Sequence, residues 1–286
     1  MPVYVSTTCL AKASNIFHVL EAYAKAGLKY VELGASHEYI DDSLLAEFKK
    51  YRFSFMVHHY FPPPQRPFIL NLASQNATIL AQSKKQIKKS IDFCHSLGIT
   101  LFTFHAGFQA DPDSKFRFSQ SKVIVPYEVA FNTFVESARE LNEYAQDKGV
   151  KIAVENNVLS EYNVVNGENP FLLLCQAEEF EKLWERIPST NVGAVLDLGH
   201  LKVTSHWLGF DKHEFVDKIK SRVFSIHVHE NNGLVDEHRN LDEQSWCLEV
   251  INRREFAGVP VTLESMNLSI EEINRSRNLV ERYLAS

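Results

Sequence analysis

The chain has 286 residues, of which 45% are hydrophobic and 23% are charged, so it carries enough apolar material for a large core and is not expected to be disordered. Its formal net charge of −6 argues against a general basic surface for nucleic acid, although a local basic patch stays open. Four widely spaced cysteines without a CxxC pair argue against disulfides or a thiolate zinc site. No segment approaches the about 18 apolar residues of a membrane span, so we expect a cytoplasmic protein without a membrane partner.

Short apolar segments rich in β-branched or aromatic residues alternate with longer amphipathic segments along the chain. The predicted strands are Val3–Ser6, Tyr30–Leu33, Ser54–His58, Leu101–His105, Lys151–Glu155, Gly193–Asp197, Val223–His227 and Val261–Glu264. Helical patterns separate them, and three of these end at Gly27, Gly98 and Gly149, which we expect to act as C-terminal caps. Eight such units close more naturally into a barrel than into an open sheet, although a doubly wound fold stays an alternative. We therefore predict that residues 1–286 form a single α/β domain, a (β/α)8 TIM barrel.

Two of the predicted connections are long, namely His59–Arg66 and Phe108–Val125, and both follow strand ends. Long loops on this side of a barrel usually carry substrate contacts. We expect the walls of a pocket to include four aromatic residues: Tyr60, Phe61, Phe108 and Trp207.

Ionisable residues stand at the C-terminal ends of nearly all the predicted strands. They are Glu32, His58, His105, Glu155, Asp197, His227, His229 and Glu264. The strand ends of a barrel converge on one face, where buried charges are costly unless they are paired or bind a metal. A mixture of imidazoles and carboxylates is a ligand set for zinc, manganese, iron or cobalt. The pattern therefore predicts a metal site.

Each of these residues taken alone also has an ordinary structural explanation, because a lone histidine is more often a hydrogen-bonded core or surface residue than a ligand. Independent accidents would not place so many of them at the same ends of successive strands, which favours a site. Five other histidines fall in helical or loop patterns and are predicted to lie on the solvated surface: His18, His37, His95, His206 and His213.

The order of the motifs resembles endonuclease IV and the sugar phosphate isomerase/epimerase-like proteins of the xylose isomerase-like TIM barrel superfamily, which includes the AP endonuclease family 2. The resemblance rests on VHHYFPPPQRPFILNLAS, FTFHAG, VENN, LDLGH and IHVHENNGLVDEH, and it covers most of the chain. It implies one to three divalent metal ions per chain, with nine ligands: His58, His105, Glu155, Asp197, His200, His227, Asp236, His238 and Glu264.

The resemblance to the mononuclear sugar epimerases implies a smaller metal core, formed by Glu155, Asp197, His227 and Glu264. Glu155 or Glu264 would move the proton, and His200 would act on the substrate. We therefore expect a metal-dependent isomerase or epimerase whose partner is a small carbohydrate or sugar phosphate. Glu32 and His59 are candidates for supporting the ligands, and a homodimer that closes the pocket stays open.

The alternative is an endonuclease IV-like phosphodiesterase that cleaves abasic DNA with three metals, and the full ligand set favours it. The acidic charge opposes it, as does DEHRNLDEQSW, which lacks the Gly-x-Gly turn that follows Asp-x-His in the relatives. The lysines of residues 84–89 are better explained as a solvated helix face than as a DNA patch. A barrel that binds a metal or sugar without turnover is the third, non-enzymatic hypothesis.

Overall fold

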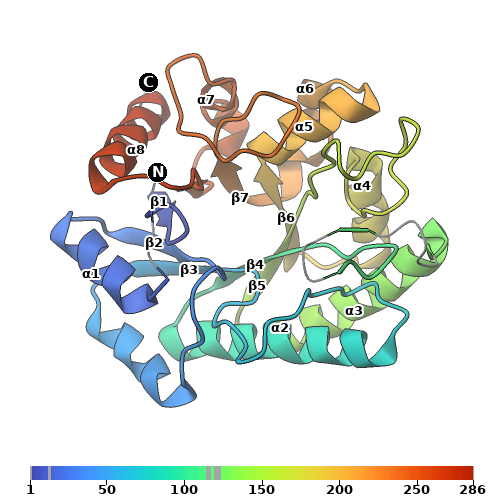
Figure 1. The fold of residues 1–286 in the computed structure, drawn as a ribbon, viewed down its shortest axis with the longest axis horizontal. Coiled ribbons are helices and arrows are strands. Elements are labelled where there is room, and N and C mark those ends of the chain that lie inside the picture. The colour runs from blue at the N-terminus through green and yellow to red at the C-terminus, as the bar shows by residue number, and fades with distance from the viewer. Residues whose placement is uncertain (1, 12–13, 114–116, 119–123, 286) are drawn as a thin grey trace.

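Eight parallel strands form a closed barrel in the computed structural model, which describes residues 2–11, 14–113, 117–118 and 124–285 (Figure 1). Each strand pairs with its neighbours in chain order, and β8 returns to β1. The strands are β1 (Val3–Ser6), β2 (Tyr30–Leu33), β3 (Ser54–His58), β4 (Leu101–His105), β5 (Lys151–Glu155), β6 (Val192–Asp197), β7 (Val223–Val228) and β8 (Val261–Leu263). The closed order confirms the predicted (β/α)8 barrel over the open sheet.

Helices surround the barrel on its outside (Figure 1). The α-helices are α1 (Ile16–Lys25), α2 (Ala77–Leu97), α3 (Tyr127–Asp147), α4 (Ala177–Arg186), α5 (Leu198–Leu208), α6 (Lys212–Ile219), α7 (Cys247–Ile251) and α8 (Ile270–Leu284). The 3-10 helices are η1 (Asp42–Lys50), η2 (Lys220–Arg222) and η3 (Arg254–Phe256). Gly27, Gly98 and Gly149 all have a left-handed backbone where α1, α2 and α3 end, as predicted for C-terminal caps.

The predicted strand bounds hold for β1 to β5, and the other three strands differ by one residue. β6 begins at Val192, β7 extends to Val228, and β8 ends at Leu263, so that Glu264 follows its strand instead of ending it. Of the predicted long connection Phe108–Val125, residues 114–116 and 119–123 lie outside the described residues. That residues 1–286 form one domain stays a prediction.

The alternation of side chains along each strand separates the site from the core. Successive residues of a strand face opposite sides of the sheet. On β4, Phe102 and Phe104 pack in the hydrophobic layer outside the barrel, whereas Thr103 and His105 face its inside with the other polar strand residues. On β5, likewise, Val154 packs in the hydrophobic layer outside the barrel and Glu155 faces its inside. The barrel fold thus turns the polar residues at the strand ends toward one another.

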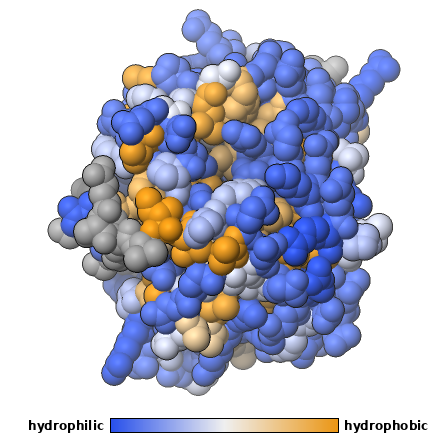
Figure 2. All heavy atoms as spheres, turned by 90° about the vertical axis from the view of Figure 1, so that its right-hand side faces the viewer, coloured by the Kyte–Doolittle hydropathy of each residue, from blue (hydrophilic) through white to orange (hydrophobic). Residues whose placement is uncertain are grey.

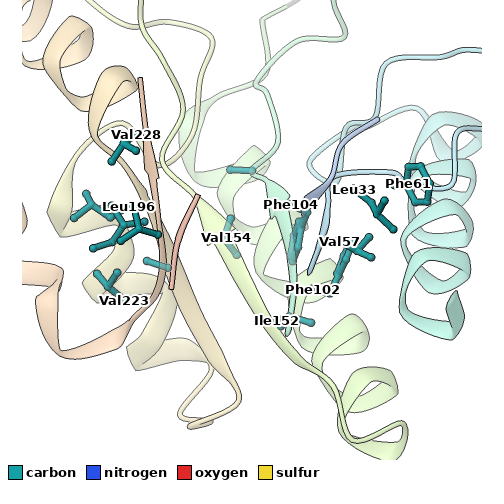
Figure 3. Close-up of a cluster of buried hydrophobic side chains, with 14 of the residues drawn as sticks. Leu33, Val57, Phe61, Phe102, Phe104, Ile152, Val154, Leu196, Val223 and Val228 are labelled. Atoms are coloured by element: carbon teal, nitrogen blue, oxygen red, sulfur yellow. The ribbon is translucent and has the colours of Figure 1, made fainter. Parts of the chain in front are cut away.

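The hydrophobic core lies mainly between the strands and the helices. Figure 3 shows part of it, with Val57, Phe104, Val154, Leu196 and Val228 contributed by successive strands. A second cluster of buried apolar residues lies above β4 and β5, in the loops that follow them: Phe108, Ala110, Leu159, Phe171, Leu172 and Cys175. The main core fixes the strand ends, and the second cluster fixes two of the loops that surround them.

The exterior is predominantly polar. The face on the right of Figure 1 is largely hydrophilic, and its hydrophobic residues are confined to a few patches (Figure 2). Among the described residues, no helix combines the length and the apolar character needed to pass through a bilayer. The homodimer considered from the sequence stays a prediction.

Candidate metal centre

The C-terminal ends of the strands bring all nine residues of the predicted ligand set into one region, in overlapping groups. The inner group consists of Glu155, Asp197, His227 and Glu264. The outer group consists of His200, His229, Asp236 and His238. A third group joins His58 to Glu155 and His227, and His105 lies beside it. In each group, one potential ligand atom per residue lies within 4.8 Å of those of the others.

The inner group converges on one nitrogen of His227. Its Nδ1 lies 3.4 Å from Oε2 of Glu264, 3.7 Å from Oε1 of Glu155 and 3.9 Å from Oδ2 of Asp197. Glu155, Asp197 and His227 are fully buried, and Glu264 is 6% exposed. Within the described residues, neither His227 Nδ1 nor Asp197 Oδ2 makes a hydrogen bond of acceptable geometry. Buried polar atoms without partners are costly, so this donor set fits a cation that would satisfy them.

Burial and opposite charge act against each other in the inner group. Burial lowers the pKa of the His227 imidazole, but the carboxylates of Glu32 and Glu264 outweigh it, so this pKa lies well above its ordinary value. Burial likewise raises the pKa of the Glu264 carboxyl, yet His227 brings it down to about 2. Three carboxylates facing one imidazole leave negative charge in excess, which a divalent cation neutralises.

The far side of His227 is held by Glu32, a fully buried residue of β2. His227 Nε2 lies 3.1 Å from Oε2 of Glu32, and the Thr262 hydroxyl donates to the same oxygen at 3.3 Å. A carboxylate that binds one imidazole N–H leaves the other ring nitrogen available to a metal. The supporting role expected for Glu32 therefore has a geometric basis in this contact.

His58 and His105 lie on the other side of Glu155. His58 Nε2 lies 3.3 Å from Nε2 of His105 and 3.4 Å from Oε2 of Glu155. The Thr103 hydroxyl donates to a backbone carbonyl, so it accepts the hydrogen bond of 2.9 Å from His58 Nδ1–H. That tautomer leaves Nε2 unprotonated toward the site. Burial and the nearby histidines lower the pKa of the His58 imidazole, which keeps it neutral as a metal ligand must be.

The outer group contains Asp236 and His238, which lie in the connection that follows β7. His238 Nε2 and His200 Nε2 lie 3.0 Å and 3.4 Å from Oδ2 of Asp236. Both rings direct their other nitrogen to a backbone carbonyl, that of Glu264 for His238 and that of Asn156 for His200. His238 has a positive φ of 46°, a left-handed backbone conformation that is uncommon for a residue other than glycine. The DEH segment therefore reaches the strand ends without the Gly-x-Gly turn.

The sequence analysis placed His229 at a strand end but left it out of the ligand set, and the structure includes it in the outer group. Its place in the IHVH motif, two residues after His227, is the feature of the sequence that marks it as a potential ligand. His37 was wrongly assigned to the surface. It is 8% exposed, and its Nε2 lies 2.8 Å from Oγ1 of Thr7.

A cavity of about 350 Å³ opens onto the groups. His58, His105, His200 and Glu264 line it from the strand ends. Its other walls are mostly apolar and come from the surrounding loops, with Tyr60, Leu70, Phe108, Phe118, Leu172 and Met266. Two aromatic residues expected in the pocket lie elsewhere: Phe61 packs in the main core, and Trp207 packs against the second cluster. No lysine or arginine lines this cavity among the described residues.

The NLAS segment connects two loops at the cavity. Oδ1 of Asn71 accepts from the backbone N–H groups of Ala73 and Phe108, and its amide donates to Asp111. A Cβ at Gly107 would lie 2.6 Å from the Ala73 Cβ, so this approach requires glycine. The segment that supported the resemblance thus has a structural role, since it holds Phe108 against the cavity.

The model of one protein family, described as the xylose isomerase-like TIM barrel, matches residues 20–282. The chain belongs to this family. Among curated relatives, it is 26% identical to the uncharacterized protein MJ1311 of Methanocaldococcus jannaschii over 219 residues, which cover 75% of this chain and 67% of that protein. The family agrees with the resemblance drawn from the motifs.

Solved structures with the same fold include proteins named for sugar epimerisation. A D-tagatose 3-epimerase-like protein superposes with a TM-score of 0.76 at 21% identity, covering 100% of this chain and 97% of that one. A D-psicose 3-epimerase from Clostridium cellulolyticum H10, solved with D-tagatose, gives a TM-score of 0.68 at 15% identity, covering 99% and 95%. The IOLI protein with a zinc atom gives 0.68 at 16% identity, covering 100% and 97%. At these identities the likeness establishes the fold alone.

Proposed function

We propose that this protein is a metal-dependent isomerase or epimerase that acts on a small hydroxy-carbonyl compound such as a sugar. The observation that carries the proposal is the inner group, which contains buried and unsatisfied ligand atoms and whose Glu264 lines a cavity about the volume of a small-ligand site. The epimerase names of the similar structures support the same substrate class.

Glu155, Asp197, His227 and Glu264 would hold the catalytic divalent cation, for which the N/O donor set suits zinc, manganese, iron or cobalt. When bound, such a cation polarises a carbonyl and lowers the pKa of an adjacent C–H or O–H group. Glu264 lines the cavity and would take a proton from the substrate, with Glu155 as the second carboxylate. His200 also lines the cavity and would orient a substrate oxygen.

A multinuclear phosphodiesterase is the second candidate, because His58, His105 and the outer group exceed what one cation needs. Glu155 supports it, since its Oε2 faces His58 and its Oε1 faces His200 and His227, as a bridging carboxylate would. Against it, the cavity is small and lined by apolar loops, and Lys84 and Lys88 of α2 pair with Glu140. We therefore place isomerisation first.

The test is a panel of free and phosphorylated aldoses and ketoses, incubated in D2O with protein loaded with zinc, manganese or cobalt. Epimerised or isomerised product that carries deuterium at the reacting carbon, and that fails to form after chelation, is the expected result. Cleavage of an abasic duplex without any sugar turnover would overturn the isomerase proposal in favour of the second candidate. If metal-loaded protein converted neither the sugars nor the abasic duplex, both enzyme proposals would be overturned. A protein that binds a metal or sugar without turnover would then remain.

A further inference from the structure

His229 is the member of the outer group that contacts Asp197 of the inner group, and no step proposed above uses it. The residue follows the last position of β7 and is 1% exposed. Its Nε2 lies 3.2 Å from Oδ1 of Asp197, which belongs to the inner group. Its ring stacks on that of His238 in the outer group, with centroids 3.8 Å apart and an interplanar angle of 15°. His229 is therefore in contact with both groups.

The contact with Asp197 defines what His229 can do. Oδ1 of Asp197 is a carboxylate oxygen, which can only accept in this contact. His229 Nε2 must then carry the hydrogen. The backbone N–H of His200 donates to the same Oδ1 at 2.6 Å, because Asp197 is the N-cap of α5. Two donors hold Oδ1 and leave Oδ2 directed toward His227 Nδ1.

The contact with His238 depends on an unusually close approach to the backbone. The ring of His229 covers Gly199, where an added Cβ would lie 2.0 Å from Cε1 of the ring. Any other residue at position 199 would displace the ring from its stack on His238 and from Asp197. The glycine of the DLGH segment and the second histidine of IHVH thus form one structural unit.

We propose that His229 is a positioning residue that couples the two groups by holding Oδ1 of Asp197, which leaves Oδ2 for the metal, and by supporting the ring of His238. The proposal rests on the metal centre described under the proposed function. A ring that donates from Nε2 toward Asp197 acts through the ligands, so removing it weakens metal binding without removing a ligand.

The test compares two substitutions by titrating Co2+ and Zn2+ against a competing chelator. His229→Phe keeps a ring that can stack on His238 but cannot donate to Asp197, and we expect metal affinity to fall about 10- to 100-fold. His229→Gln keeps a hydrogen-bond donor near the Nε2 position, so its metal affinity should fall clearly less than that of the Phe variant. His206→Gln, an exposed histidine of α5, is the matched control. The visible spectrum of bound Co2+ should change in the Phe variant, which a general loss of stability would not produce.

A double-mutant cycle between Gly199 and His229 provides a second measurement, which does not depend on the folding of any single variant. Gly199→Ala should weaken metal binding in the unaltered chain, because the new Cβ displaces the ring, but should add little in a His229→Ala background. Equal losses in both backgrounds, or unchanged affinity in His229→Phe, would overturn the coupling role. If the unaltered chain bound no metal, the metal centre itself would fail, and the coupling role with it.

Discussion

The inner and outer groups lie side by side but are built in different ways. Glu155, Asp197, His227 and Glu264 come from or directly follow the ends of four consecutive strands, whose hydrogen-bonded register places them. Asp236 and His238 belong to the connection after β7, which is held by the bridge between Glu230 and Arg239 and by the hydrogen bond from Met266 N–H to the His238 carbonyl.

The two loop residues of the outer group are also less buried than the inner group, whereas His200 and His229 are buried. The inner side chains are 0% to 7% exposed, whereas those of Asp236 and His238 are 19% and 12% exposed. A site fixed by a closed sheet holds its ligands rigidly, and this is what precise chemistry requires. A site that takes some of its ligands from a loop keeps its geometry only while that loop is ordered. We therefore expect the reaction at the inner group and a supporting role for the outer one.

The largest effect is expected from the inner group. Glu264→Gln keeps the shape of the side chain but removes the carboxylate that lines the cavity, so sugar turnover should fall about 10²- to 10⁴-fold. Initial rates on the best substrate of the panel, measured on protein with verified metal content, check this. Glu161→Gln, at an exposed position in the loop after β5, should leave the rate unchanged. A Glu264→Gln protein with full activity would remove the inner group from the mechanism.

A smaller effect on turnover is expected from the outer group. The double variant Asp236→Ala, His238→Ala removes two of its ligand side chains and leaves the inner group intact. We expect one class of bound metal to disappear in elemental analysis while turnover stays within about tenfold of the unaltered chain, since ligands outside the reacting site act indirectly. Complete loss of activity would instead support a multinuclear mechanism and the phosphodiesterase candidate.

The same difference explains what could be predicted from the sequence. Glu155 is the last residue of a strongly apolar strand and His227 the last but one of another, and parallel strands in a barrel leave little choice about where such residues point. The convergence of Asp236 and His238 followed from resemblance alone, because no periodicity describes a loop whose bend occurs at a histidine with positive φ. The burial of His37 and the contact of His229 with the inner group depend on residues distant along the chain, Thr7 and Asp197, which local patterns do not encode.

The smallest expected effect is on the stability of the metal-free protein. Burial lowers the pKa of the His238 imidazole, but the carboxylate of Asp236 raises it to about 9, against an unfolded value of about 6.5. Because the folded pKa is higher, the contribution of this proton to stability is complete below about pH 6.5 and is lost as pH rises through about 9. In the presence of chelator, the melting temperature should therefore decline between about pH 6.5 and about pH 9. This decline should be steeper than any change in melting temperature outside that interval.

The His238→Gln variant provides the control for this decline, because it keeps a hydrogen-bonding side chain but has no proton to lose in this range. Its melting temperature with chelator should fall less steeply over the same interval. Bound metal requires the unprotonated imidazole, so metal-loaded protein should show the opposite trend, gaining stability as pH rises toward 9. An identical slope with and without His238 would show that His238 does not hold this proton, and the charge of Asp236 would then be balanced by His200.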